Sequence, residues 1–188
     1  MMSRLRRAGF AWLAILTIVA CARSNDKSGG NGSAAAGDSS GSFRPLQPGD
    51  AVPVYATSTL GGDTVRLGGS QAVTVLNVWA TWCTSCREEM SDLETLRKEF
   101  APQGVRVVGV SVDGGDGTRV KRFAEGEKLA FIVAHDPEQR IQQLYQVAGV
   151  PETFVIAKDG KLVWRHVGNL HSVVDSVRTV LTSAVGTP

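Results

Sequence analysis

The chain has 188 residues, of which 43% are hydrophobic and 20% are charged, and its formal net charge at pH 7 is +2. This size and composition are typical of one globular domain with a short appendage. Arg4, Arg6 and Arg7 supply three of the 20 basic residues, so the rest of the chain carries 17 basic residues against 18 acidic ones. No basic patch is left to indicate a nucleic-acid partner, and that class is excluded.

The first 20 residues have the organisation of an export signal. Three arginines precede an apolar run over residues 8–20, which is shorter than the roughly 20 residues that a membrane-spanning helix needs. The run ends at Cys21 in a pattern that resembles the bacterial lipobox, and this resemblance implies that Cys21 becomes the lipidated N-terminus. Ordinary signal-peptidase cleavage after Ala22 and an uncleaved anchor are the alternatives. Each of the three places the protein outside the cytoplasm.

Residues 22–41 are rich in serine, glycine and alanine and contain almost no large apolar side chain. Such a segment cannot bury enough surface to fold. We therefore predict a signal peptide over residues 1–20, a lipid-anchored flexible linker over 21–42 and one folded domain over 43–188.

The folded domain begins with two short strands, over residues 54–59 and 64–67, and a glycine-rich turn between them predicts a hairpin. Residues 73–80 form a near-continuous apolar run, as expected for a central strand that is covered on both faces. A helix is expected over about 85–100, because its apolar residues recur at helical spacing on one stripe: Met90, Leu93, Leu96 and Phe100.

The remaining pattern alternates strands and helices and then ends in a second hairpin. Strands that alternate with helices pair in parallel, so we expect an α/β fold with a mixed central sheet and helices on both faces. The expected elements are a strand over 105–112, a loop over 113–117, a short helix to about 125, a strand over 130–134, a helix over 138–145, a hairpin of strands 152–157 and 161–167, and a helix over about 171–183.

The most informative motif is the pair Cys83 and Cys86, spaced C-x-x-C between the central strand and the helix that follows it. A helix N-terminus stabilises a thiolate, which makes the first cysteine a nucleophile at neutral pH. A structural zinc site normally needs four ligands, and the chain offers no second such motif to supply them. A purely structural disulfide would close a very small loop and gain little from chain entropy. The redox interpretation is favoured, with no metal and no cofactor beyond the Cys83–Cys86 disulfide.

Two segments resemble the active site of thioredoxin. Residues 77–86 (NVWATWCTSC) are similar to its cysteine region, and residues 149–154 (GVPETF) are similar to its cis-proline segment. The resemblance extends over about residues 46–185. Specifically, the chain is similar to the TlpA/ResA/DsbE-like branch of membrane-tethered thiol–disulfide oxidoreductases. Members of this branch have a redoxin or AhpC/TSA-type domain. The resemblance implies a thioredoxin-like fold with an N-terminal β-hairpin and a central insertion of a helix and a strand between about 116 and 134.

The same resemblance implies roles for the site residues. Cys83 would attack the disulfide of a partner, and Cys86 would then attack the sulfur of Cys83 and release the reduced partner. Pro151 would form a cis peptide bond facing the cysteines, and Val150 would offer backbone hydrogen bonds to an extended substrate. Trp82 fits a wall of the active site.

Glu89 lies three residues after Cys86, and in the TlpA/ResA-like branch the matching glutamate is implicated in proton handling. A buried carboxylate with a raised pKa could accept the proton of Cys86. A solvated helix acid is the alternative. Asn77 stands where thioredoxins usually carry a buried aspartate, and asparagine cannot take up a proton. Ser85 and Ser91 both replace the proline of many relatives.

By resemblance, the protein would reduce disulfides of exported proteins, with apocytochrome c as one plausible target, and would draw electrons from a membrane thiol donor. It would be a bacterial membrane lipoprotein facing the periplasm. Two other classes are considered. A thiol peroxidase shares this fold, but the P-x-x-x-T-x-x-C setting of its cysteine is absent. A non-catalytic lipoprotein would use the cis-proline groove only to hold a partner.

Overall fold

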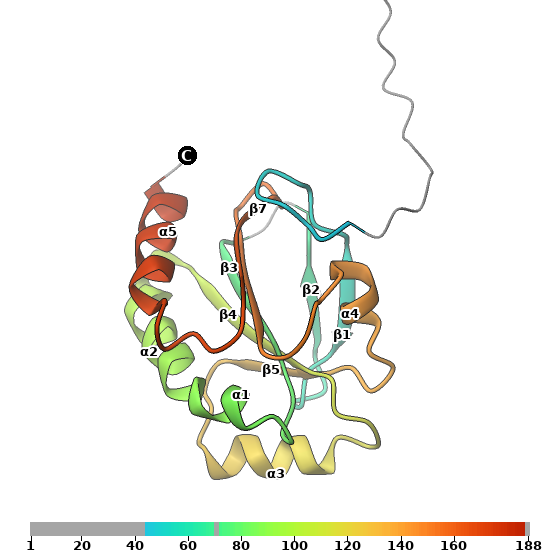
Figure 1. The fold of residues 1–188 in the computed structure, drawn as a ribbon. Helices are drawn as coiled ribbons and strands as arrows, with labels where there is room; N and C mark the ends of the chain where they lie inside the picture. Colours follow the sequence, from blue (N-terminus) through green and yellow to red (C-terminus); the bar gives the residue numbers. More distant parts are fainter. Residues whose placement is uncertain (1–43, 70–71, 187–188) are drawn as a thin grey trace, which may run out of the picture. The chain divides into compact units, whose positions relative to one another are not determined.

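The computed structural model describes residues 44–69 and 72–186. Strands and helices alternate through the middle of the domain, and strand pairs lie at both ends of it (Figure 1). In chain order the elements are β1 (Tyr55–Ser58), β2 (Thr64–Leu67), β3 (Thr74–Trp79), α1 (Thr84–Glu88), α2 (Met90–Phe100), the 3₁₀ turn η1 (Ala101–Gln103), β4 (Arg106–Ser111), α3 (Thr118–Gly126), β5 (Ile132–His135), α4 (Arg140–Tyr145), β6 (Glu152–Ile156), β7 (Leu162–Val167) and α5 (Val174–Gly186).

Across the described residues, five strands form the central sheet in the order β5–β4–β3–β6–β7, and β1 pairs with β2 in a separate hairpin. β3 is parallel to β4 and β4 is parallel to β5, whereas β6 is antiparallel to both β3 and β7. The predicted mixed sheet, with parallel pairs in the middle and hairpins at the ends, is confirmed.

Helices cover both faces of this sheet. Figure 1 shows α2 and α5 side by side on one face, and the hairpin β1–β2 with α4 on the other. Every residue of β3 is buried, as the apolar run predicts for a central strand. Leu93 of α2 and Val177 of α5 are both fully buried, so the two helices share one hydrophobic core under the sheet.

The helix α3 and the strand β5 lie where the central insertion was expected. β5 forms one edge of the sheet and pairs only with β4 among its named strands. The hairpin is attached to this edge, because the backbone N–H of Leu60 donates to the carbonyl of Val133 at 2.9 Å. The N-terminal hairpin is therefore tied to the insertion.

One predicted helix is interrupted in the structure, so the prediction of a single continuous helix was wrong. The expected helix over 85–100 is divided at Glu89 into α1 and α2, although the apolar stripe on α2 is buried as expected. The backbone of Glu89 has φ −86° and ψ −3°. Its side chain turns into the core and binds groups outside the helix on both oxygens, which holds this residue out of a regular helix.

Two other helices differ from prediction at their boundaries. α4 begins at Arg140 rather than near residue 138, because Gln139 has a positive φ of 56° that is incompatible with a helix. α5 begins at Val174 rather than near residue 171. The residues just before it contact α1 and α2 instead of extending the helix.

The predicted signal peptide (1–20), the lipidation site Cys21 and the linker (21–42) lie outside the described residues, so they stay predictions. Within residues 44–69 and 72–186, no helix has both the length and the hydropathy needed to cross a bilayer.

Candidate active site

The cysteine pair follows a tight turn at the end of β3. The backbone N–H of Cys83 donates to the carbonyl of Ala80 at 3.2 Å and closes this turn. Trp79, the last residue of β3, is fully buried, whereas Trp82 is 62% exposed. The turn therefore moves the chain from the core to the surface within three residues and places Trp82 beside the cysteine pair.

Cys83 and Cys86 form a disulfide, so the structure is that of the oxidised protein. Cys83 is slightly exposed and Cys86 is completely buried, which is the order that the proposed attacking and resolving roles require. The backbone N–H of Cys86 donates to the sulfur of Cys83 at 3.1 Å, at the N-terminus of α1. The Ser85 hydroxyl lies 3.4 Å from the same sulfur and can donate to it. Both donors would stabilise a thiolate on Cys83.

The loop before β6 faces the disulfide. The Val150–Pro151 peptide bond is cis, as the resemblance implied. The carbonyl oxygen of Val150 lies 3.6 Å from the sulfur of Cys83. Two segments about 65 residues apart in the sequence thus meet at one sulfur atom, and together with Trp82 they form the surface around it.

Glu89 follows Cys86 by three residues, between α1 and α2, and is completely buried. Its carboxylate accepts hydrogen bonds from the side-chain amide of Asn77 and the backbone N–H of Leu170, both at 2.7 Å. Burial raises the pKa of Glu89 to about 7, and these two hydrogen bonds oppose the shift. The carboxyl group can therefore gain or lose a proton near neutral pH, unlike a solvated helix acid.

Replacing Glu89 by glutamine is expected to remove part of the pH dependence of stability. Between pH 4.5 and about 7 the folded protein keeps a proton that the unfolded chain has lost. The free energy of unfolding of the wild type therefore falls as pH rises through this window, by on the order of 3 kcal/mol in total. Urea unfolding of the oxidised protein at four pH values from 4.5 to 7.5 measures this fall. Glu88→Gln, an exposed neighbour, is the control. Parallel curves for wild type and Glu89→Gln would contradict the assignment.

Asn77 connects Glu89 to the cis-proline strand. Its side-chain amide also donates to the hydroxyl of Thr153 at 3.0 Å, and Thr153 is the register partner of Asn77 across β3 and β6. Because an amide cannot titrate in this range, Glu89 is the titratable group of this cluster.

The loop between β7 and α5 contacts the start of the helix with three successive residues. The side-chain amide of Asn169 donates to the carbonyl of Ser85 at 2.9 Å, and the next residue binds Glu89. The imidazole of His171 lies 3.2 Å from the Asp92 carboxylate. The sequence pattern gave no signal for these contacts, because the loop carries no motif and is remote in the chain.

Two buried acids that no sequence motif marks also bind segments of the site. Asp113 follows β4 and binds Thr81 in the turn before Cys83. Glu152 follows Pro151 and binds the guanidinium of Arg165 and the backbone N–H of Ala148. The available signal was the position of Asp113, since an acid at the carboxyl end of a central parallel strand lies at the edge where sites form.

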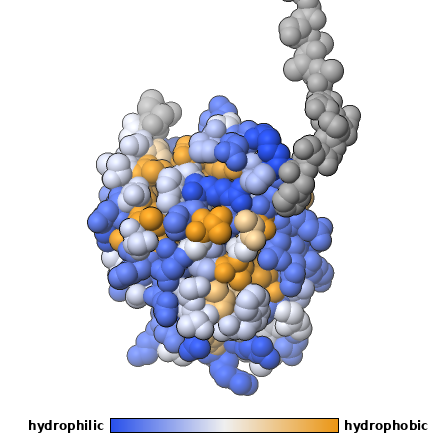
Figure 2. Space-filling view, viewed as in Figure 1, coloured by the Kyte–Doolittle hydropathy of each residue, from blue (hydrophilic) through white to orange (hydrophobic). Residues whose placement is uncertain are grey.

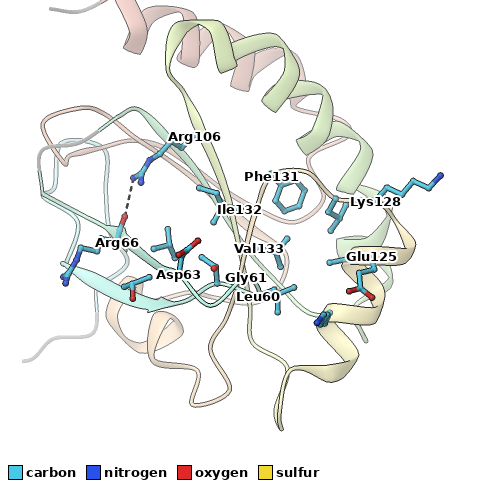
Figure 3. A pocket seen from close by; sticks show the side chains of 16 residues that line it. Leu60, Gly61, Asp63, Arg66, Arg106, Glu125, Lys128, Phe131, Ile132 and Val133 are labelled. Atoms are coloured by element: carbon cyan, nitrogen blue, oxygen red, sulfur yellow. Dashed lines mark hydrogen bonds between the residues drawn. The ribbon is translucent and has the colours of Figure 1, made fainter.

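A separate cavity of about 830 Å³ lies between β2, α3 and β5 (Figure 3). Leu60, Phe131 and Ile132 contribute apolar side chains to it, and no residue of the cysteine turn or the cis-proline loop lines it. In the described part of the chain, no three histidine, cysteine or acidic side chains form a group that could hold a metal ion. The disulfide therefore lies outside this cavity.

The molecular surface mixes hydrophobic and hydrophilic residues, as one face shows in Figure 2. Single exposed hydrophobic side chains are normal in folded proteins. Of the large hydrophobic side chains that are exposed in the described residues, Trp82 is the one adjacent to the cysteine pair. It is available for contact with a partner.

Comparisons with known proteins agree with this geometry. The family model described as the AhpC/TSA family matches residues 48–165. The thiol-disulfide oxidoreductase ResA of Oceanobacillus iheyensis is 34% identical over 119 residues, which are 61% of this chain and 62% of that protein. The thioredoxin-like protein YneN of Bacillus subtilis is 33% identical over 128 residues, which are 66% of this chain and 74% of that protein. A crystal structure from Chlorobium tepidum, described as a thiol:disulfide interchange protein DsbE, has a TM-score of 0.69 and 28% identity and covers 75% of this chain and 99% of its own.

The sheet order, the cysteine pair at a helix start and the facing cis-proline define a protein of the thioredoxin superfamily, and the chain belongs to the AhpC/TSA family. Within that superfamily it is of the TlpA/ResA/DsbE-like type. Its similarity to thiol–disulfide oxidoreductases, together with its C-x-x-C disulfide, makes it a redox enzyme.

Proposed function

We propose that the protein reduces disulfides of exported proteins outside the cytoplasm, with Cys83 as nucleophile and Cys86 as resolving cysteine. The observation that carries this proposal is the arrangement at Cys83. Its sulfur receives the backbone N–H of Cys86, faces the carbonyl of Val150 and is the more exposed of the two. An extended segment of a substrate would lie along Val150 with Trp82 beside it.

The first step joins the protein to its substrate. The thiolate of Cys83 attacks one sulfur of the substrate disulfide, and a new S–S bond forms as the substrate bond breaks. The departing substrate sulfur takes the electron pair and then a proton from solvent. The donors at the start of α1 hold Cys83 as a thiolate at neutral pH, which makes it competent for this attack.

The second step releases the substrate. Cys86 loses its proton to the carboxylate of Glu89, three residues further along the chain, and attacks the sulfur of Cys83. The mixed disulfide breaks, and the second substrate sulfur leaves with the electron pair and then takes a proton from solvent, while Glu89 returns its proton to solvent. The substrate gains two electrons, and the protein returns to the disulfide form. A thiol donor must then reduce Cys83–Cys86 before the next cycle.

The leader sequence supports a location outside the cytoplasm, and the thiol–disulfide oxidoreductases among the relatives support disulfide-containing partners. The export signal over 1–20 and lipidation of Cys21 would tether the domain to a bacterial membrane facing the periplasm. Exported proteins with disulfides would be the substrates, and the haem-site cysteines of apocytochrome c are one candidate. A membrane thiol donor would supply the electrons, since an exported reductant has no direct contact with cytoplasmic thiols.

The direction of exchange is tested by the reduction potential of the purified full-length chain, titrated against a thiol–disulfide buffer. A reductant is expected to titrate near the potential of thioredoxin, roughly −270 mV. A potential near roughly −120 mV, as for a strong oxidant, would reverse the direction and make the protein a disulfide donor.

The exchange itself is tested by trapping. A Cys86→Ala variant lacks the resolving sulfur, so partners should accumulate as mixed disulfides on Cys83 that dithiothreitol releases. The double variant Cys83→Ser, Cys86→Ala is the matched control and should trap nothing. A single variant without adducts, together with full complementation by a Cys83→Ser, Cys86→Ser chain, would favour a non-catalytic binding module.

A further inference from the structure

Asp113 is a buried acid that the reaction scheme above does not use. It lies two residues beyond the end of β4 and is only 3% exposed. One carboxylate oxygen accepts from the backbone N–H of Thr81 at 2.8 Å and from the hydroxyl of Ser111 at 2.7 Å. The other oxygen accepts from the hydroxyl of Thr81. Three neutral donors therefore converge on one buried carboxylate.

Thr81 lies within the turn that carries the site. It follows Ala80, whose carbonyl accepts the N–H of Cys83, and it directly precedes the exposed Trp82. Both of its polar donors, the backbone N–H and the side-chain hydroxyl, bind the same acid. The turn is thus anchored at its first residue to the end of the neighbouring strand, two residues before the reactive sulfur.

Further contacts hold Asp113 itself in place. The ring of His135 lies 2.8 Å from the backbone carbonyl of Asp113, and the backbone N–H of Asp113 faces the Ser111 hydroxyl at 3.2 Å. Within the described residues Asp113 has no salt-bridge partner. Burying an unpaired charge is costly unless hydrogen bonds satisfy it, so a carboxylate here implies that its hydrogen bonds are needed.

We propose that Asp113 is a positioning residue for thiol–disulfide exchange, which sets the place of the Trp82–Cys83 turn through its two hydrogen bonds to Thr81. The inference rests on the proposed function and adds a residue to it. A carboxylate accepts on both oxygens and makes all three hydrogen bonds charge-assisted. An asparagine would have to reverse the bond to the Thr81 hydroxyl and would leave only neutral hydrogen bonds to the turn. Loss of the anchor lets Cys83 move relative to the N–H of Cys86 and the carbonyl of Val150, on which its reactivity depends.

The test compares three variants of the full-length chain: Asp113→Asn, Thr81→Val and Thr81→Ser. Thr81→Val keeps the size of the side chain and removes its hydroxyl, whereas Thr81→Ser keeps both donors. The rate of exchange with glutathione disulfide is expected to fall roughly tenfold in Asp113→Asn and Thr81→Val, as for loss of one hydrogen bond to a charged group. It should stay within about twofold in Thr81→Ser.

The thiolate titration of Cys83, followed by absorbance near 240 nm, gives a readout that a merely structural role would not move. Its midpoint should shift in Asp113→Asn and Thr81→Val and remain in place in Thr81→Ser. The double variant Asp113→Asn, Thr81→Val should be little slower than Asp113→Asn alone, because the hydroxyl that Thr81→Val removes donates to the same carboxylate.

Asp136→Asn is the matched control, since Asp136 is equally buried but caps α4 through the N–H of Ile141. It should change the unfolding midpoint without moving the exchange rate or the thiolate midpoint. Unchanged rate and titration in Thr81→Val, or the same changes in Asp136→Asn, would overturn the inference. A wild-type chain that does not exchange would instead overturn the proposed function, while the titration would still report on Asp113.

Discussion

Replacing Cys83 by serine is expected to reduce thiol–disulfide exchange to the uncatalysed background. Loss of a nucleophile of this kind costs on the order of 10⁶-fold in rate. A serine hydroxyl stays protonated at neutral pH and forms no disulfide, and Cys86 cannot take over because it is completely buried. The measurement is the reduction of an insulin disulfide in the presence of dithiothreitol, or the rate of exchange with glutathione disulfide.

Two further variants serve as controls for this prediction. Cys21→Ser removes the remaining cysteine of the chain and should leave the exchange rate of the purified protein unchanged. Cys86→Ser should still form the first mixed disulfide while it fails to release it. Substantial turnover by Cys83→Ser would mean that the exposed and buried cysteines have exchanged roles.

Replacing Glu152 by glutamine is expected to lower the free energy of unfolding by roughly 3–5 kcal/mol, the cost of breaking a buried ion pair from one side. Glu152 is completely buried and binds Arg165, whose side chain is 12% exposed. With the acid removed, the guanidinium keeps its charge without its partner. Arg165 also donates to the carbonyl of Gln146 at 3.1 Å, so the loop that leads to Pro151 should loosen as well.

Urea unfolding of the oxidised protein at pH 7 measures this loss. The control is Asp159→Asn, which breaks a surface pair with Lys161 in which both side chains are more than half exposed, and should leave the unfolding midpoint almost unchanged. A double variant, Glu152→Leu with Arg165→Leu, should recover much of the loss because no uncompensated charge remains. Equal and small effects of Glu152→Gln and Asp159→Asn would contradict the assignment.

Much of the fold follows from local pattern. The apolar run of β3 is typical of a strand buried on both faces, and glycine-containing turns indicate both hairpins. The break at Glu89 could not be predicted, because the helical spacing of the apolar residues continues through it. What interrupts the helix is a pair of hydrogen bonds from β3 and from the loop before α5, and periodicity contains no information on such contacts.

The site residues also fall into two groups: those that belong to a sequence motif and those that only the tertiary fold reveals. The cysteine pair and Pro151 belong to motifs, so they were identified before the fold was known, and the structure places them together. No motif marks Asp113 or Asn169, since each acts through hydrogen bonds with a residue far away in the sequence. A lone acid after a strand and a lone asparagine in a loop are common in any chain, and only the tertiary fold distinguishes these two.

The contacts of the loop before α5 have a consequence for the order in which the enzyme is made. Leu170 is 81 residues beyond Glu89, and Asn169 is 84 residues beyond Ser85. Synthesis proceeds from the N-terminus, so a growing chain carries both cysteines long before it carries the two groups that bind beside them. A fragment that ends before residue 169 contains the whole C-x-x-C motif and lacks this support. The reactive pair is therefore synthesised soon after β3, but it acquires its full set of hydrogen-bonding neighbours only when the loop before α5 has been made.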